Sequence, residues 1–377
     1  MHYLDHNATS PLRPEARAAI ERALGSANPS SIHAEGRKAR ALVEEARARV
    51  AKLANTDPQN VIFTSGGTEA NALALHAAIY GSAEAEARLT RIFVSAIEHE
   101  SVLANINALI DRFAGLRLET LPVTANGTLD LDALRVALRE GKGRALVAVM
   151  AANNETGVIQ PIAEIAKLAR EAGARLFVDA IQAAGKIPLD FDADYLTISS
   201  HKLGGPQGAG ALVLKSGAPF APQILGGGQE RGHRAGTENV PAIAGFGAAA
   251  AEAGSTLSTA LRDRFERALK EIVPDAIIFG SDAPRLVNTS NFALPNILAE
   301  TAVMALDLDS VMISSGAACS SGKVRPSHVL AAMGVSEDVA SCALRVSFGW
   351  NSTEQDADAA IASLSKLLAR ARSRAAA

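Results

Sequence analysis

The feature that most constrains the fold is an alternation of short apolar runs with helical patterns over the first two thirds of the chain. The runs have the length and composition of buried strands, at residues 60–64 (NVIFT), 91–95 (RIFVS), 144–150 (RALVAVM), 175–179 (RLFVD) and 195–199 (YLTIS). A helical stripe precedes the first run, formed by Ala39, Leu42, Val43, Ala46, Val50 and Leu53. Strands that alternate with helices in this way predict an α/β fold, with a mostly parallel sheet covered by helices on both faces.

The pattern changes at Pro241, where a long alanine-rich helical stretch is followed by strand-like runs near 276–279 and 287–294. We interpret this part as a smaller α+β domain, and we expect a helix to cross between the two domains around residues 250–261. The predicted division is a large domain over 13–255 and a small domain formed by 1–12 and 256–377. With 377 residues, 48% of them hydrophobic, the chain can fill both cores.

Composition narrows the choice of partners. Lys and Arg total 37 against 40 for Asp and Glu, a net charge of -3, which disfavours nucleic acid or an anionic membrane as the partner. The N-terminus, MHYLDHNATS, has an acid at Asp5 and no basic or apolar region of a signal peptide, and the apolar stretch 240–251 is too short to span a bilayer. Two cysteines give no disulfide framework. We therefore expect a cytoplasmic protein that acts on small molecules and protein partners.

The two cysteines differ in their surroundings. Cys342 lies in the apolar segment ASCALRVSF, where a buried thiol is the ordinary expectation. Cys319 lies in SSGAACSSGKVR, which has little side chain to bury and predicts an exposed loop. Lys323 and Arg325 favour the thiolate there, so Cys319 is the candidate for a reactive thiol.

A lysine at the end of the fifth apolar run is the leading candidate for chemistry. Lys202 stands in SSHKLGGPQG, after the strand and before a glycine-rich turn. A lysine amine can form a Schiff base with an aldehyde cofactor only if a useful fraction is neutral, which burial or nearby cations provide. The alternative is an ordinary surface lysine beside a turn.

Polar residues also follow the other predicted strands. The sequence SGGTE (65–69) follows the first strand and opens a helix, an arrangement that presents backbone N–H groups and a hydroxyl to a phosphate. His99 in IEHES follows the second strand, and its alternative is a histidine that merely begins a helix. The carboxyl ends of parallel strands line the ligand crevice of open α/β sheets, so both are site candidates.

The next strand ends carry Asn154 and Glu155 in NNETG, and then Asp179 with Gln182 three residues later. An aspartate at a strand end could simply cap the following helix. It could equally be the partner of a protonated ring nitrogen. Because successive strand ends all carry polar groups, one active-site crevice explains them better than scattered helix caps.

Taken in order, the motifs resemble a known family. The chain is similar to fold-type I pyridoxal-phosphate enzymes of the class V aminotransferase family, specifically cysteine desulfurases of the NifS/IscS type. The match runs from YLDHNAT to LRVSFG through SGGTEAN, EHESVL, NNETG, VDAIQAAGK, SSHKLGGPQG, GGGQERGHRAGTENV, and SSGAACSSG followed by PSHVL. The departures are Ser10 for a usual threonine, Ala317 where GSAC is commoner, and Ser320 for threonine, and none removes a group that the chemistry requires.

The resemblance implies roles around the cofactor ring. Lys202 would hold pyridoxal 5'-phosphate covalently, and Asp179 would keep its pyridine nitrogen protonated. Gln182 would bind the phenolic oxygen and His99 would stack on the ring, with Asn154 contacting cofactor and substrate. The phosphate would be bound by Gly67, Thr68, Ser199, His201 and, from the second subunit of a homodimer, Thr237.

The resemblance also implies a substrate site and a reaction. Asn154 and Arg345 match residues that bind the carboxylate of L-cysteine, and Asn7 and Asn28 match residues lining the same pocket. Lys202, freed by the substrate amine, would remove the Cα proton, and Cys319 would take the sulfur as a persulfide while L-alanine leaves. The sulfur would pass to an acceptor such as an iron–sulfur scaffold protein, with no intrinsic metal and with Cys319 as a transient contact for a cluster.

The sequence leaves other functions and residue roles open. A transaminase or a selenocysteine lyase would keep the cofactor but change the reaction, and a transaminase needs no thiol on a loop. A non-enzymatic binding module would use the same crevice. Arg345 could be only a charge at a strand end, and Lys366, Arg370, Arg372 and Arg374 complement the dipole of the last helix or bind a partner.

Overall fold

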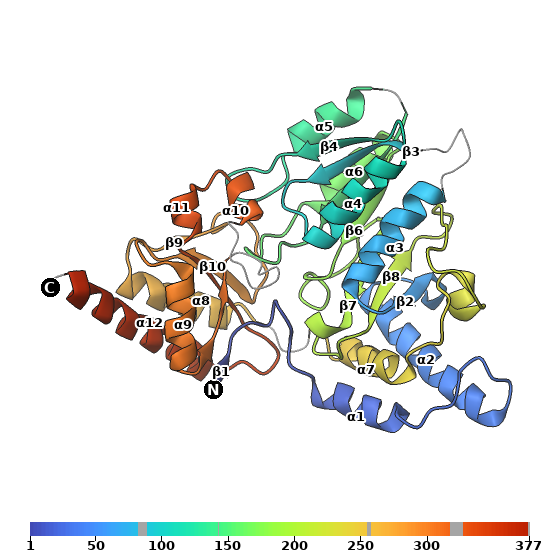
Figure 1. Ribbon diagram of the computed structural model, residues 1–377, viewed down its shortest axis with the longest axis horizontal. Coiled ribbons are helices and arrows are strands. Elements are labelled where there is room, and N and C mark those ends of the chain that lie inside the picture. Colours follow the sequence, from blue (N-terminus) through green and yellow to red (C-terminus); the bar gives the residue numbers. More distant parts are fainter. Residues whose placement is uncertain (82–88, 142, 255–257, 317–326, 376–377) are drawn as a thin grey trace.

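A computed structural model describes residues 1–81, 89–141, 143–254, 258–316 and 327–375, and two main sheets with flanking helices dominate it (Figure 1). Among these residues the large sheet has seven strands, in the order β2-β8-β7-β6-β5-β3-β4. Their bounds are β2 (Val61–Thr64), β3 (Leu89–Ser95), β4 (Arg117–Leu121), β5 (Arg144–Met150), β6 (Arg175–Asp179), β7 (Tyr195–Ser199) and β8 (Gly210–Leu214). Neighbouring strands are parallel except where β8 pairs antiparallel with β2 and β7.

Both faces of the large sheet are buried, because successive strand residues belong to different apolar clusters. Val147 joins the cluster formed with α1 (Pro14–Ala23), α2 (Ala34–Leu53), α5 (Leu131–Arg139), α6 (Ile162–Glu171) and α7 (Val240–Ala251). Ala148 joins the cluster formed with α3 (Gly67–Tyr80) and α4 (Glu100–Arg112). A strand buried on both faces reads as a continuous apolar run, as RALVAVM does.

The second sheet is antiparallel and has its own apolar cluster. Its order is β12-β13-β10-β9, with β9 (Ile277–Ile278), β10 (Thr289–Ala293), β12 (Ser314–Ser315) and β13 (Ala343–Ser347). The cluster joins this sheet to α8 (Ala260–Ile272), α9 (Ala299–Leu308) and α12 (Glu354–Ala375). Two short helices, α10 (His328–Ala332) and α11 (Glu337–Ala340), pack beside it with the buried Cys342.

The N-terminal residues join the two sheets. Strand β1 (His2–Tyr3) pairs in parallel with β11 (Val311–Met312), beside the small sheet (Figure 1). Residues 5–10, here called the N-terminal strap, then reach the large sheet. The Asn7 N–H donates to Ser347 Oγ at 2.9 Å, and the Ser10 N–H donates to the His201 carbonyl at 2.9 Å.

The predicted α/β architecture with its mostly parallel sheet is confirmed. The five predicted strands are present to within two residues at each end, and the two later runs contain β9 and β10. The expected helix across 250–261 is wrong: α7 ends at Ala251, Gly254 adopts a φ of +83°, and α8 begins at Ala260. The predicted domain boundary at 255–256 lies outside the described residues and stays a prediction. In the described part of the chain, no helix is long and apolar enough to cross a membrane.

Candidate active site

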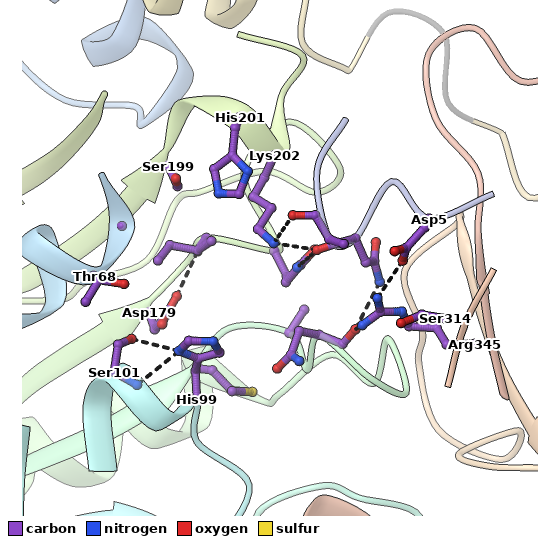
Figure 2. Close-up of a pocket in the computed structure, with 18 residues that line it drawn as sticks. Asp5, Thr68, His99, Ser101, Asp179, Ser199, His201, Lys202, Ser314 and Arg345 are labelled. Carbon is purple, nitrogen blue, oxygen red and sulfur yellow. Dashed lines mark hydrogen bonds and ion pairs between the residues drawn. The ribbon is translucent and has the colours of Figure 1, made fainter. Parts of the chain in front are cut away.

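A cavity of about 560 Å³ lies where the carboxyl ends of β5, β6 and β7 meet the first turns of α3 and α4, β13 and the N-terminal strap. Most of the predicted site residues line it: Asn7, Gly67, Thr68, His99, Asn154, Asp179, Gln182, Ser199, His201, Lys202 and Arg345. Figure 2 shows Thr68 and Ser199 at one end, the pair Asp5–Arg345 at the other, and the amine of Lys202 between them. The cavity therefore has two polar ends and a lysine in its middle.

Lys202 ends a 3-10 turn, η2 (Ser200–Lys202), that directly follows β7. Its Nζ donates to the backbone carbonyls of Asn7, at 2.5 Å, and Ala8, at 2.8 Å. Burial, and then the positive charge of Arg345, lower the pKa of Lys202 to about 8. An amine with this pKa is partly neutral near physiological pH, so it can act as a nucleophile or a base.

Asp179 is the last residue of β6, and its carboxylate is held from two sides. Oδ1 accepts from the Ile181 N–H at 2.9 Å, and Oδ2 accepts from Asn71 Nδ2 at 2.8 Å. Asn71 is fixed in turn, because its Oδ1 accepts from Thr197 Oγ1 at 2.6 Å. Burial raises the pKa of Asp179, against the opposing effect of these hydrogen bonds and of nearby His99 and Lys202. A carboxylate buried in this way gains from a cationic partner in the cavity.

His99 both caps a helix and lines the cavity, so its two sequence interpretations hold together. Its Nδ1 accepts from the Ser101 N–H at 3.1 Å at the start of α4. Burial, opposed by Asp179 and assisted by Lys202, lowers the pKa of His99. The imidazole is therefore neutral at physiological pH, and its ring lies near Asp179, which also lines the cavity (Figure 2).

The end of the cavity near α3 is suited to a phosphate. Helix α3 begins at Gly67, and no side chain of the N-cap residue Gly66 caps it, so the first N–H groups of the helix are available to an anion. Ser199 Oγ is buried and has no hydrogen-bond partner in the described part of the chain. A Cβ at Gly67 would lie 2.4 Å from Ile181 Cδ1 and 3.1 Å from Ser199 Cβ, so only glycine leaves this cradle open. Burial and then Lys202 lower the pKa of His201 to about 4.

The opposite end presents a guanidinium. Arg345 on β13 is 5% exposed, and it donates to the Asn154 carbonyl at 3.0 Å and to Asp5 Oδ1 at 2.6 Å. Its Nε is buried and lacks a partner among the residues described. The guanidinium of Arg345 is planar, carries only donors and is held in place, and the described residues leave its Nε–H unpaired. Such a group is suited to binding a carboxylate.

Asn7 of the N-terminal strap connects the parts of this site. Its Nδ2 donates to Thr289 Oγ1 at 2.9 Å and to the Asn154 carbonyl at 3.2 Å. Its own carbonyl accepts from Lys202 and, at 2.8 Å, from Gln182 Nε2. The small sheet thus contributes to the environment of the lysine through one asparagine.

Two predicted site residues, Asn28 and Thr237, do not line the cavity. Asn28 is exposed and its Oδ1 accepts from the Ser30 N–H at 2.8 Å, while Thr237 is also exposed and away from the lining. Cys319 lies outside the described residues, so its predicted role remains a prediction. Cys342 is 7% exposed, as expected of a buried thiol.

Four supporting residues were not identified from the sequence as site residues: Asn71, Ser101, Asp5 and Ser314. Asn71 lies four residues after Gly67, one helical turn along α3, so helical spacing could have suggested it, and Ser101 lies two residues after His99. Asp5 and Ser314 line the cavity only because the chain brings its first and last parts together. No local pattern signals that approach.

Comparisons of the sequence with a family model and with known proteins agree on one family. The model of the family described as Aminotransferase class-V matches residues 2–360. An "IscS-like cysteine desulfurase" of Mycobacterium tuberculosis is 41% identical over 385 residues, which cover 99% of this chain and 97% of that protein. A "Cysteine desulfurase" of Cereibacter sphaeroides is 43% identical over 365 residues, covering 94% of this chain and 92% of the relative.

Solved structures agree with the sequence relatives. A NifS-like protein from Rickettsia africae superposes with a TM-score of 0.87 at 35% identity, covering 98% of this chain and 99% of that one. A structure described as SspA in complex with cysteine superposes with a TM-score of 0.81 at 29% identity, covering 94% of this chain and all of that one. The fold and nearly the full length are therefore shared with these proteins.

Proposed function

The chain belongs to the class-V aminotransferase family, and we propose that it is a pyridoxal-phosphate-dependent cysteine desulfurase that converts L-cysteine to L-alanine. Relatives at about 40% identity over nearly the whole chain carry this name. The observation that carries the proposal is the position of Lys202, whose partly neutral amine lies between an anion cradle at α3 and the guanidinium of Arg345. A cofactor phosphate and a substrate carboxylate would occupy those two ends.

The described residues fit pyridoxal phosphate. The unpartnered Ser199 Oγ, the open cradle at Gly67 and the first N–H groups of α3 supply donors for the phosphate. Asp179 would bind a protonated ring nitrogen, which its buried carboxylate supports because it gains from a cation. Lys202 would hold the aldehyde carbon covalently, with Gln182 at the phenolic oxygen. When bound, the cofactor supplies an electron sink for the negative charge that develops at the substrate Cα.

The proton chemistry falls to Lys202. Its lowered pKa, about 8, means that the amine released by an incoming amino acid is neutral often enough to take a proton from Cα. The carbonyls of Asn7 and Ala8 accept hydrogen bonds from the resulting ammonium, so the proton remains at Nζ until it is returned. Arg345 and Asn154 bind the substrate carboxylate in this proposal. They thereby determine which face of the substrate Cα faces Lys202.

Sulfur transfer falls to Cys319 in this proposal. Its thiolate attacks the substrate sulfur, so the substrate C–S bond breaks and an S–S bond forms as a persulfide. The carbon skeleton takes up the released electron pair and a proton and leaves as L-alanine, which balances the reaction without an external oxidant or reductant. An acceptor protein then takes the sulfur, for iron–sulfur cluster assembly or another use in the cytoplasm.

A homodimer completes the proposed site. Thr237 is exposed and lies away from the cavity of its own chain. We assign it to the phosphate of a second copy's cofactor. Asn28, also exposed, would face the same shared pocket.

The proposal is tested by substituting Lys202, Cys319 and Cys342 in turn. Purified protein reconstituted with pyridoxal phosphate is expected to be yellow, and Lys202→Ala is expected to lose the colour on dialysis. Cys319→Ala should keep the colour but produce neither alanine nor sulfide from L-cysteine, while the matched control Cys342→Ala should retain both products. Full desulfuration by Cys319→Ala, or a colourless wild type, would refute the proposal, and a keto acid product would indicate a transaminase.

A further inference from the structure

A second lysine lies behind the active-site cavity. Lys186 follows the turn after β6, next to Gly185, whose φ is +69°. Together with Lys202 it lines a small internal cavity of about 20 Å³ that also meets His6, Arg13 and Trp350. None of the roles proposed above uses this residue.

The amine of Lys186 is bound by amide oxygens. Its Nζ donates to Gln182 Oε1 at 2.9 Å and to Asn7 Oδ1 at 3.4 Å, and both acceptors belong to buried side chains. No carboxylate forms an ion pair with Lys186 among the residues described. Lys186 is half-buried, and an ammonium there without a paired carboxylate costs more than one on the surface.

The hydrogen-bond pattern of Lys186 determines how Gln182 is oriented. The amine of Lys186 donates to the Oε1 of Gln182, so this oxygen faces Lys186. The Nε2 of the same amide then faces the Asn7 carbonyl, to which it donates at 2.8 Å. That carbonyl is also the acceptor for Lys202. Two lysines thus share one buried amide network, with Gln182 and Asn7 between them.

We propose that Lys186 is a positioning residue for Lys202, which acts by fixing the Gln182 amide and the Asn7 segment that together hold the amine of Lys202 in the cavity. The inference rests on the proposed function in taking Lys202 as the lysine that captures the cofactor. Without Lys186, the Gln182 amide is free to turn over, and the Asn7 carbonyl loses one of its two donors. Lys202 would then occupy several positions instead of one.

The charges around the pair explain why a neutral amine at Lys186 suits this role. Burial first, and then Lys202 and Arg345, lower the pKa of Lys186 to about 7. The other charged and titratable groups near the pair are His6, Arg13, Asp5, Asp179 and His201, and Arg49 and Lys52 line a groove together with Lys186. At pH 8 a neutral Lys186 still donates to Gln182 without placing a second full charge beside Lys202.

The experiment uses cofactor-free full-length protein and two substitutions of Lys186 that differ in hydrogen-bond donation. Lys186→Met removes the N–H donors, whereas Lys186→Gln keeps an N–H donor. The exposed Lys167→Met on α6 is the control. Two readouts are measured at pH 8: the rate at which each apo-protein captures pyridoxal phosphate, and the visible circular dichroism of the bound cofactor. Both report how Lys202 and the ring are placed.

We expect Lys186→Met to capture the cofactor about tenfold more slowly, the effect of leaving one buried acceptor unsatisfied. Lys186→Gln should lie closer to the wild type than to Lys186→Met. Combining Lys186→Met with Gln182→Leu should cost less than the sum of the two single effects, since both act through one amide. Wild-type capture and dichroism in Lys186→Met, no recovery in Lys186→Gln, or strict additivity would each overturn the proposal.

The outcomes separate this inference from the proposed function. A wild type that captures the cofactor but yields no alanine from cysteine would refute the desulfurase proposal and leave the effect of Lys186 measurable. A wild type that desulfurates cysteine, with no difference between the Lys186 variants, would refute only the positioning role. Melting temperatures check folding, because a purely structural role predicts a lower melting temperature in both Lys186 variants.

Discussion

The buried ion pair between Arg47 and Glu230 offers the sharpest test of the packing. Arg47 on α2 donates to Glu230 at 2.6 and 2.9 Å, and each side chain is 1% exposed. Arg47 also donates to the Val61 carbonyl at 3.0 Å, and Glu230 accepts from the Phe63 N–H at 2.9 Å. The pair therefore covers the free edge of β2, the first strand of the large sheet.

The substitution Arg47→Met removes one partner and leaves the Glu230 carboxylate buried with little compensation. Breaking such a pair from one side costs about 3–5 kcal/mol of unfolding free energy. The matched control is Arg49→Met on the same helix, which breaks the exposed pair with Glu45 and should cost about 0.3–0.5 kcal/mol. The double variant Arg47→Met with Glu230→Gln should recover part of the loss, because the uncompensated charge is gone.

Urea unfolding followed by far-ultraviolet circular dichroism measures all four proteins under one condition. The predicted order of stability is wild type, then Arg49→Met close behind, then the double variant, then Arg47→Met. If Arg47→Met costs no more than Arg49→Met, the pair does not stabilise the β2 edge and the reasoning is refuted. The same conclusion would follow if the double variant were less stable than Arg47→Met.

Two further predictions concern the site. Gly67→Ala should weaken pyridoxal phosphate binding by about tenfold in a spectrophotometric titration, because its Cβ would lie 2.4 Å from Ile181 Cδ1, which must move, and 3.1 Å from Ser199 Cβ in the phosphate cradle. Unchanged affinity would contradict the assignment of the cradle. The stability of the apo-protein should rise with pH between about 7 and 10.5, because unfolded Lys186 keeps its proton up to 10.5 while folded Lys186 loses it above about 7. Lys186→Met should flatten this rise in denaturation measured at several pH values, and an equally steep rise would count against a lowered pKa.

Much of the fold and part of the candidate site could be predicted from local sequence patterns. The strands β5, β6 and β7 are buried on both faces, so their apolar runs were evident, and the polar residues after them meet at one sheet edge for geometric reasons. Strand β4 escaped prediction because it is an edge strand with mostly exposed polar residues, RLETL. Strand β8 follows a glycine turn and pairs antiparallel within a parallel sheet, which no local pattern announces.

Long-range contacts could not be predicted from local patterns. The bond between Asp5 and Arg345 joins residues 340 apart in the chain, and Asn71 reaches Asp179 from a different element. The prediction of a helix across 250–261 is wrong because α7 already ends at Ala251, and Gly254, with its φ of +83°, lies outside the helical region. Alanine favours a helix, so the composition of this segment did not reveal the break.

The N-terminal strap also bears on the order in which the protein can be made. The carbonyls of the strap accept hydrogen bonds from Lys202. The position of the strap itself depends on its hydrogen bond to Ser347 and on the pairing of β1 with β11. These first residues leave the ribosome first, before Ser347 and β11, to which they bind, have been synthesised. Closing so long a loop comes late in folding. The lysine pocket is thus completed only after nearly the whole chain has been synthesised, so cofactor capture follows translation.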